Sequence, residues 1–154
     1  MQITVAAVGT RLESWVYDAF DTYKARLPRH LGLELEEVPL GRRAAGASAA
    51  VEEEGERLLR HVRPGALTLA LDERGQQWSS AELAGQLRNW LEQQPRVAIL
   101  VGGPDGLSAA CRERADRIWS LSRLTFPHAV VRVLLAKQLY RAWTILQGHP
   151  YHRA

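Results

Sequence analysis

The sequence predicts an α/β protein with a mostly parallel sheet and helices on both faces of that sheet. Short apolar runs of strand length alternate with longer segments in which apolar residues recur every three or four positions. Several of the short runs are hydrophobic at nearly every position, which is typical of strands buried on both faces. The 154 residues, 46% hydrophobic and 24% charged, predict one globular domain over residues 1–154.

The first elements follow from these patterns in order. A buried strand is expected over residues 3–8, where Gly9 ends the apolar run. A helix should follow, with Ser14 as its N-cap and Pro28 just beyond its end. Over residues 33–38, leucine and valine alternate with glutamate, which predicts a second and less buried strand.

The middle of the chain predicts a mobile loop, a helix and a third strand. Residues 41–50 are small and basic, and we expect them to form the loop that leads into a helix over about residues 49–62. The third strand is expected over residues 67–71, and residues 72–75 should lead the chain away from it.

The last five elements are predicted by similar signals, namely capping serines, prolines and apolar runs. They are a helix from Ser79 or Ser80, a strand over residues 97–101, a short helix from Ser108 to Arg114, a strand over residues 117–120 and a final helix from Pro127 to about Gln147.

Charge and cysteine content limit the classes of function. The formal net charge of +3 is compatible with an anionic partner but does not require one. Cys111 is the single cysteine, which excludes an intrachain disulfide and a zinc site built on cysteines, and predicts a reducing, cytoplasmic location. The N-terminus lacks the pattern of a signal peptide, and no apolar run has the length of a membrane span, so we expect no membrane association.

Three loops are candidates for a ligand site, because ligands of parallel sheets bind at the carboxyl ends of strands. These loops follow Leu71, Val101 and Leu121. The loop over residues 102–106 contains three glycines, which allow a close approach of backbone to ligand, yet it matches neither phosphate-binding glycine pattern. Both a ligand loop and an ordinary turn between strand and helix fit this sequence.

The C-terminal helix is apolar around most of its circumference, whereas a helix on one face of a sheet needs one apolar stripe. It is therefore either a core helix in a crowded environment or one buried on two sides, against its own sheet and a second subunit, and we favour the second. Six arginines and one lysine lie near these loops, where they either form a solvated face or contact phosphates. They are Arg42, Arg43, Arg123, Arg132, Lys137, Arg141 and Arg153. His149 and His152 are separated by Pro150, so no metal site is expected.

Across its whole length the chain resembles the RlmH family of SPOUT-class RNA methyltransferases. The matching segments share their order with the family. They are Val5-Ala6-Ala7-Val8-Gly9, Glu53-Glu54-Gly55-Glu56, Leu71-Asp72 with Gly75, Val101-Gly102-Gly103 with Gly106-Leu107, Ser120-Leu121-Ser122, Thr125-Phe126-Pro127-His128, Val131-Arg132-Val133, Tyr140-Arg141-Ala142-Trp143 and Tyr151-His152-Arg153.

The resemblance implies methyl transfer from S-adenosylmethionine to N3 of a pseudouridine in the helix 69 loop of large-subunit (23S) ribosomal RNA. It also implies a homodimer and a SPOUT-type trefoil knot at the C-terminus, which the usual rules of topology would not predict. Carried over position by position, the methyl donor would contact Leu71, Gly102, Gly103, Leu121, Ser122, Arg123, Leu124, Thr125 and Phe126.

The candidate catalytic residues lie in the C-terminal third of the chain. Removal of the N3 proton calls for a base or a nearby cation. His152 is the candidate base, Arg132, Arg141 and Arg153 could stabilise the developing anion, and Tyr151 belongs to the same group. Lys137 departs from the family, whose members often carry an acidic residue there.

Two alternatives lack this chemistry. The first is a non-catalytic module on the same fold that binds the ribosome or RNA, and the second is a flavodoxin-like nucleotide binder. The glycine loop and residues 121–126 argue against the first alternative, and titration with S-adenosylmethionine distinguishes it from an enzyme.

Overall fold

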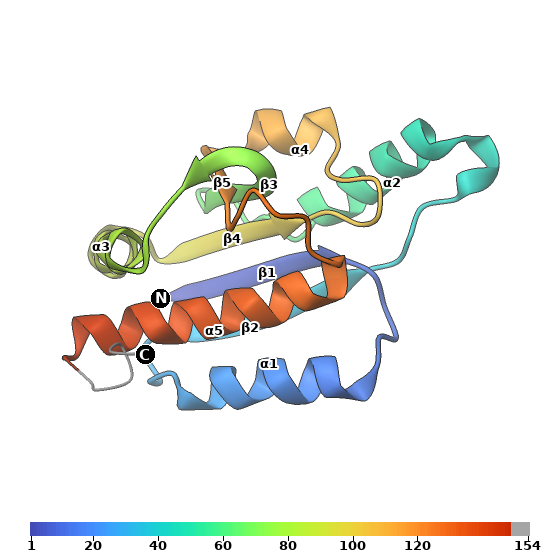
Figure 1. The fold of residues 1–154 in the computed structure, drawn as a ribbon. Helices are drawn as coiled ribbons and strands as arrows, with labels where there is room; N and C mark the ends of the chain where they lie inside the picture. The colour runs from blue at the N-terminus through green and yellow to red at the C-terminus, as the bar shows by residue number, and fades with distance from the viewer. Residues whose placement is uncertain (149–154) are drawn as a thin grey trace.

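A computed structural model describes residues 1–148 and contains a five-stranded sheet with the strand order β2-β1-β4-β3-β5 (Figure 1). Every strand pair is parallel, which confirms the predicted α/β class. The elements in chain order are β1 (Gln2–Val8), α1 (Ser14–Arg26), β2 (Gly32–Val38), the 3-10 helix η1 (Arg43–Ala45), α2 (Ala47–Leu59), β3 (Leu67–Gln77), α3 (Ser80–Gln93), β4 (Arg96–Val101), α4 (Ala109–Arg114), β5 (Arg117–Ser120) and α5 (His128–Leu146).

Helices cover both faces of the sheet, with α1, α3 and α5 on one face and α2 and α4 on the other (Figure 1). Side chains of a strand alternate between the faces, so β1 contributes to two cores. Ile3 and Val5 join the core beneath α1, α3 and α5, whereas Ala6 and Val8 join the core beneath α2 and α4. The continuous apolar run of β1 is explained by this burial on both faces.

Helix α5 lies between α1 and α3 and packs against both. Its residues Leu135, Ala136, Leu139 and Ala142 are buried against the sheet, and none of the residues His128–Leu146 is exposed. These neighbours account for much of the wide apolar circumference within one chain. The homodimer therefore stays a prediction, as do the single domain and the knot.

Serine N-caps were predicted for three helices, and the structure confirms those of α3 and α4 but not that of α1. Ser79 caps α3 in a capping box, in which its hydroxyl accepts from the Glu82 amide and the Glu82 carboxylate accepts from the Ser79 amide. Ser108 caps α4 by accepting from the Cys111 amide. The prediction for Ser14 is wrong, because Ser14 is the first helical residue and Glu13 occupies the N-cap without a side-chain hydrogen bond.

Two further predictions are corrected by the structure. The helix expected from residue 49 begins at Ala47, and the loop before it contains η1, whose Arg43 is held by two ion pairs. The third strand does not end at Leu71 but continues to Gln77. Leu71 and Gln76 both pair with Trp119 of β5, so residues 72–75 bulge out of the strand and the chain then returns to the sheet.

None of the helices within residues 1–148 is long and apolar enough to cross a membrane.

Candidate functional site

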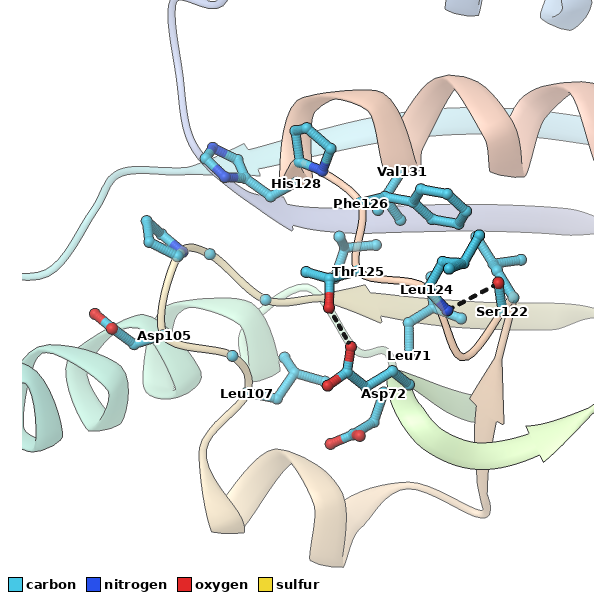
Figure 2. A pocket seen from close by; sticks show the side chains of 18 of the residues that line it. Leu71, Asp72, Asp105, Leu107, Ser122, Leu124, Thr125, Phe126, His128 and Val131 are labelled. Carbon is cyan, nitrogen blue, oxygen red and sulfur yellow. Dashed lines mark hydrogen bonds between the residues drawn. The ribbon is translucent and has the colours of Figure 1, made fainter.

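A cavity of about 760 Å³ lies at the carboxyl ends of β3, β4 and β5, where the three predicted loops meet (Figure 2). Its size is within the range of about 300–1,000 Å³ that is usual for small-molecule sites. Three segments and the start of α5 form its wall. They contribute Leu71, Asp72, Glu73 and Arg74, then Val101–Leu107, then Leu121, Ser122, Leu124, Thr125, Phe126 and Pro127, with His128 and Val131 from α5.

The glycine loop after β4 is a tight turn that closes on itself. The Gly106 amide donates to the Gly103 carbonyl at 3.1 Å, and Gly106 has a φ of +82°, which favours glycine. A Cβ on Gly102 would lie 2.6 Å from the Gly106 carbonyl carbon, and one on Gly103 would lie 2.8 Å from Cγ1 of Val8. Packing within the loop therefore requires glycine at position 102, and packing of the loop against Val8 of β1 requires it at position 103.

The bulge of β3 places charged groups on the opposite wall. Arg74 donates to the Asp72 carboxylate from Nε at 3.0 Å and from Nη2 at 2.8 Å. The hydrogen bonds from Arg74 lower the pKa of Asp72 against the opposing effect of burial, so this carboxylate is ionised at neutral pH. The Asp72–Arg74 ion pair carries no net charge, so the Glu73 carboxylate gives the bulge its net negative charge beside the cavity.

The third loop, over residues 121–127, is held by hydrogen bonds of its hydroxyl side chains. The Ser122 hydroxyl accepts from the Leu124 amide at 3.0 Å, while the Ser120 hydroxyl donates to the Ser122 carbonyl at 2.9 Å. Thr125 donates to the Glu73 carboxylate at 2.8 Å and so connects this loop to the β3 bulge. Figure 2 shows Leu71, Leu124 and Phe126 on the same side of the cavity.

The charges around the cavity are mainly negative. Asp72, Glu73 and Asp105 line it, and Arg74, which is paired with Asp72, is the lining arginine. His128 lies at the rim, where burial lowers the pKa of its imidazole and the charge of Arg132 lowers it further. The imidazole is therefore neutral at neutral pH. Apolar walls with several carboxylates suit a cationic organic ligand better than a phosphate.

All the donor contacts predicted from the sequence line this cavity except Arg123, which is exposed and does not line it. The structure thus brings together three segments that the sequence could only place after separate strands. Asp72, Glu73, Asp105 and His128 also line the cavity and were not predicted as site residues. Asp72 and Glu73 lie in the bulge of β3, Asp105 lies in the loop after β4, and His128 begins α5. All four lie in or beside the loops predicted after Leu71, Val101 and Leu121, and this signal could have identified them.

The candidate catalytic residues are not brought together within residues 1–148. Arg132 is fully buried and donates to Glu37 at 2.5 Å and to the Val8 carbonyl at 3.1 Å, away from the cavity lining. Arg141 donates to the Ser80 hydroxyl at 3.1 Å and does not line the cavity either. Tyr151, His152 and Arg153 lie outside the described residues.

Lys137 lies on α5 in a half-buried position. Burial lowers the pKa of its amine, and the neighbouring charge of Arg141 lowers it further. Within residues 1–148, no group of three or more histidine, cysteine, aspartate or glutamate side chains could hold a metal ion.

Comparison with known proteins adds sequence matches over nearly the full chain. Residues 1–152 match the family described as predicted SPOUT methyltransferase. A protein of Alkalilimnicola ehrlichii named ribosomal RNA large subunit methyltransferase H is 51% identical over 156 residues and covers 100% of both chains. A protein of the same name from Thioalkalivibrio sulfidiphilus is 50% identical over 155 residues, with 99% of each chain covered.

Solved structures resemble the fold at low sequence identity. A probable methyltransferase from Bordetella pertussis matches with a TM-score of 0.51 and 20% identity, covering 92% of each chain. A probable methylase family protein from Haemophilus influenzae matches with a TM-score of 0.54 and 12% identity, covering 96% of this chain and 67% of that one. At these identities the likeness concerns the fold alone.

Proposed function

This chain belongs to the SPOUT methyltransferase family, and on that premise we propose that it transfers a methyl group from S-adenosylmethionine to large-subunit ribosomal RNA. The names of its relatives support the class of RNA substrate. The proposed target atom is N3 of a pseudouridine in the helix 69 loop, as the resemblance to the RlmH family implies.

The observation that carries this proposal is the chemistry of the cavity wall. The donor has a sulfonium centre and an adenine ring, so its site needs apolar surface together with negative charge. Leu107, Leu121 and Phe126 supply apolar surface, while Asp72 and Glu73 supply carboxylates. A flavodoxin-like binder would instead have to place a phosphate near these carboxylates at an energetic cost.

The predicted donor contacts would act mostly through their position in the loops. Leu71, Gly102, Gly103, Leu121, Ser122, Leu124, Thr125 and Phe126 line the cavity and form our proposed donor site. Exposed Arg123 is left out of this set. Because the strand ends fix the three loops, the site is largely formed before the donor arrives, which reduces the entropy lost on binding.

The bound donor would supply an activated methyl group: as the N3–CH3 bond forms in line, the bond from sulfur to the methyl carbon would break and S-adenosylhomocysteine would leave. The residues of the chain then have to orient the two reactants, exclude water and remove the N3 proton. His152 is the proposed base, with Tyr151, Arg153 and Arg141 placing the RNA and stabilising the negative charge that develops. We leave Arg132 out of the catalytic set because its guanidinium is committed to Glu37 and Val8.

We further propose a homodimer in which α5 lies at the interface. Val130, Leu134, Lys137 and Arg141 follow one another at spacings of three and four residues, so they share the face of α5 opposite to Leu135 and Leu139. Val130 and Leu134 belong to neither core cluster. A second subunit would cover this stripe, and its C-terminal tail would then supply the catalytic residues for the methyl-transfer site of its neighbour. A knotted C-terminus is part of the same proposal.

Deletion of residues 151–154 tests the enzymatic proposal. The shortened protein should bind S-adenosylmethionine with nearly the parental affinity, measured by calorimetry, yet should fail to methylate ribosomes. Methylation at the parental rate would contradict the role of the tail. If the full-length protein bound no S-adenosylmethionine, the non-catalytic RNA-binding module would become the better explanation.

A further inference from the structure

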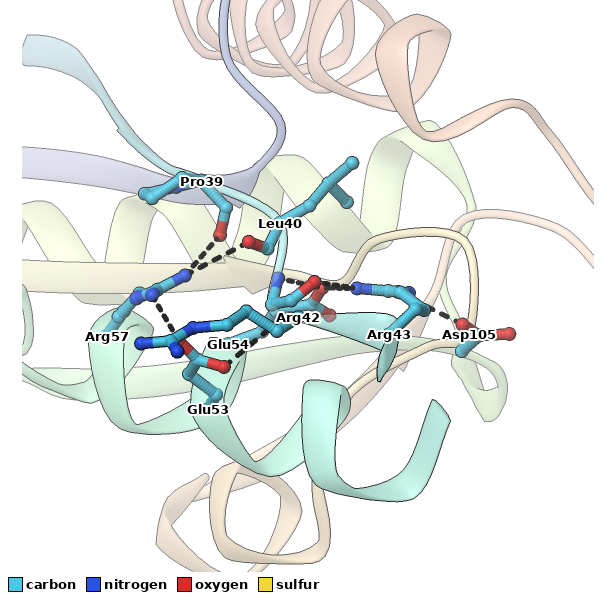
Figure 3. A network of polar contacts seen from close by, with 9 residues as sticks. Pro39, Leu40, Arg42, Arg43, Glu53, Glu54, Arg57 and Asp105 are labelled. Carbon is cyan, nitrogen blue, oxygen red and sulfur yellow. Dashed lines mark hydrogen bonds and ion pairs between the residues drawn. The ribbon is translucent and has the colours of Figure 1, made fainter. Parts of the chain in front are cut away.

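Glu54 of α2 is a buried carboxylate that lies directly beneath the glycine loop (Figure 3). Its Oε2 atom accepts from the Gly41 amide at 2.8 Å and from the Arg43 guanidinium. Its Oε1 atom has no hydrogen-bond partner within residues 1–148 and lies 3.6 Å from where a Cβ on Gly103 would be. A buried charge of this kind is costly unless it is paired, so Arg43 is needed at this position.

Arg43 connects this buried carboxylate to the rim of the cavity. Its Nη1 atom donates inward to Glu54 and to the Gly41 carbonyl, the latter at 3.0 Å. Its Nη2 atom donates outward to Asp105 at 3.0 Å. Asp105 belongs to the glycine loop and lines the cavity, whereas Arg43 does not line it. One guanidinium of η1 therefore connects Glu54 of α2 to Asp105 of the glycine loop, which is 62 residues from Arg43 in the sequence.

We propose that Arg43 is a positioning residue of the donor site, which holds the glycine loop in the conformation that binds S-adenosylmethionine. This inference rests on the proposed function, since it takes that molecule as the ligand. The apparent affinity of a site is reduced by the fraction of molecules in which its loop is out of place. Loss of the Arg43–Asp105 pair should therefore weaken donor binding although Arg43 contacts no donor.

The planar fork of arginine is needed because one side chain must satisfy two partners in different directions. A lysine at this position keeps a positive charge near Glu54 but offers a single compact ammonium group in place of the fork. Arg43→Lys should therefore release Asp105 while leaving the buried carboxylate paired. Asp105→Asn removes the charge at the other end of the same pair, and its side chain is 44% exposed, so the fold should tolerate the change.

The experiment measures S-adenosylmethionine affinity by calorimetry and thermal stability for the full-length protein. The variants are Arg43→Lys, Asp105→Asn and the double variant. Arg57→Lys is the matched control, because Arg57 is a forked arginine of α2 that donates to the Pro39 and Leu40 carbonyls and pairs with Glu53, without contacting the glycine loop.

We expect each single variant to bind the donor about three- to fivefold more weakly, the range of a partly exposed pair. The double variant should bind no more weakly than the single variants, because both changes break the same connection. Arg57→Lys should lose as much thermal stability as Arg43→Lys while keeping the wild-type affinity.

Additive losses in the double variant would show that Asp105 contacts the donor independently of Arg43, and would overturn the inference. Wild-type affinity in both single variants would also overturn it and leave the proposed function standing. Failure of the wild-type protein to bind S-adenosylmethionine would instead refute the proposed function itself.

Discussion

Replacement of Arg132 by methionine should destabilise the folded protein strongly, because this candidate catalytic residue has a structural role. The Arg132 side chain is completely buried and connects α5 to two strands. It donates to the Glu37 carboxylate in β2 at 2.5 Å and to the Val8 carbonyl at the end of β1 at 3.1 Å. Tyr17 also donates to Glu37, at 2.8 Å, so the carboxylate joins three elements of the fold.

The size of the effect follows from this burial. Removing one partner of a buried ion pair costs about 3–5 kcal/mol. Glu37 retains some solvent exposure, at 22% of its side chain, and keeps the Tyr17 hydroxyl as a partner. We therefore expect the lower end of that range, about 3 kcal/mol of unfolding free energy. Glu37→Gln should cost about 2–3 kcal/mol, because it leaves a buried guanidinium without its counter-charge.

Denaturant unfolding at a fixed protein concentration measures these values, since association would change the apparent stability. The double variant Arg132→Met with Glu37→Gln should lose at least about 1 kcal/mol less than the sum of the single losses, because the two residues contact each other. Arg123→Met is the control at an exposed arginine and should stay within about 0.5 kcal/mol of the wild type. If Arg132→Met were as stable as Arg123→Met but inactive in methylation, the structural explanation would be wrong.

Three further predictions concern the glycine loop, the rim histidine and the outer face of α5. Gly103→Val should weaken S-adenosylmethionine binding at least about tenfold and lower the melting temperature, because even its Cβ would lie 2.8 Å from Val8 and displace the loop; unchanged affinity in calorimetry would remove this loop from the site. Folding lowers the pKa of His128, so as the pH falls below about 6.5 the imidazole is protonated in the unfolded chain before it is protonated in the folded protein. The folded state therefore loses stability as the pH falls below that value. His128→Gln should therefore lose less unfolding free energy than the wild type between pH 7 and pH 5.5, and equal losses would show that this imidazole does not contribute. Leu134→Asp should shift the protein from dimer to monomer in sedimentation experiments, and a dimer of unchanged stability would place the interface elsewhere.

The sheet and the position of the cavity could be predicted because they depend on local patterns. Apolar runs fix the strands, and the carboxyl ends of parallel strands meet at one edge, so the loops after Leu71, Val101 and Leu121 had to lie close together. The cavity formed by these loops confirms that reasoning. Position in the loops predicted after Leu71 and Val101 also explains why Asp72 and Asp105 lie at the site, although neither residue was predicted to contact the donor.

The details that could not be predicted depend on partners far away in the sequence. The local sequence of residues 72–75 predicts the end of a strand. The return of Gln76 to the sheet depends instead on its pairing with Trp119 of β5. The sequence does not distinguish Arg132 from the other cations near the loops. Its structural role follows from its contact with Glu37, which is 95 residues away in the sequence. The apolar circumference of α5 could indicate a subunit or a crowded core, and packing of α1 and α3 on either side supplies the crowded core.

The most direct test of donor-dependent methylation uses the purified protein, S-adenosylmethionine with an isotope-labelled methyl group, and ribosomes from cells that lack the modification. Mass mapping of the ribosomal RNA should then find one labelled methyl group, at N3 of a pseudouridine in the helix 69 loop, and none when the protein is omitted. Absence of transfer, or label at a different nucleotide, would contradict the proposed function.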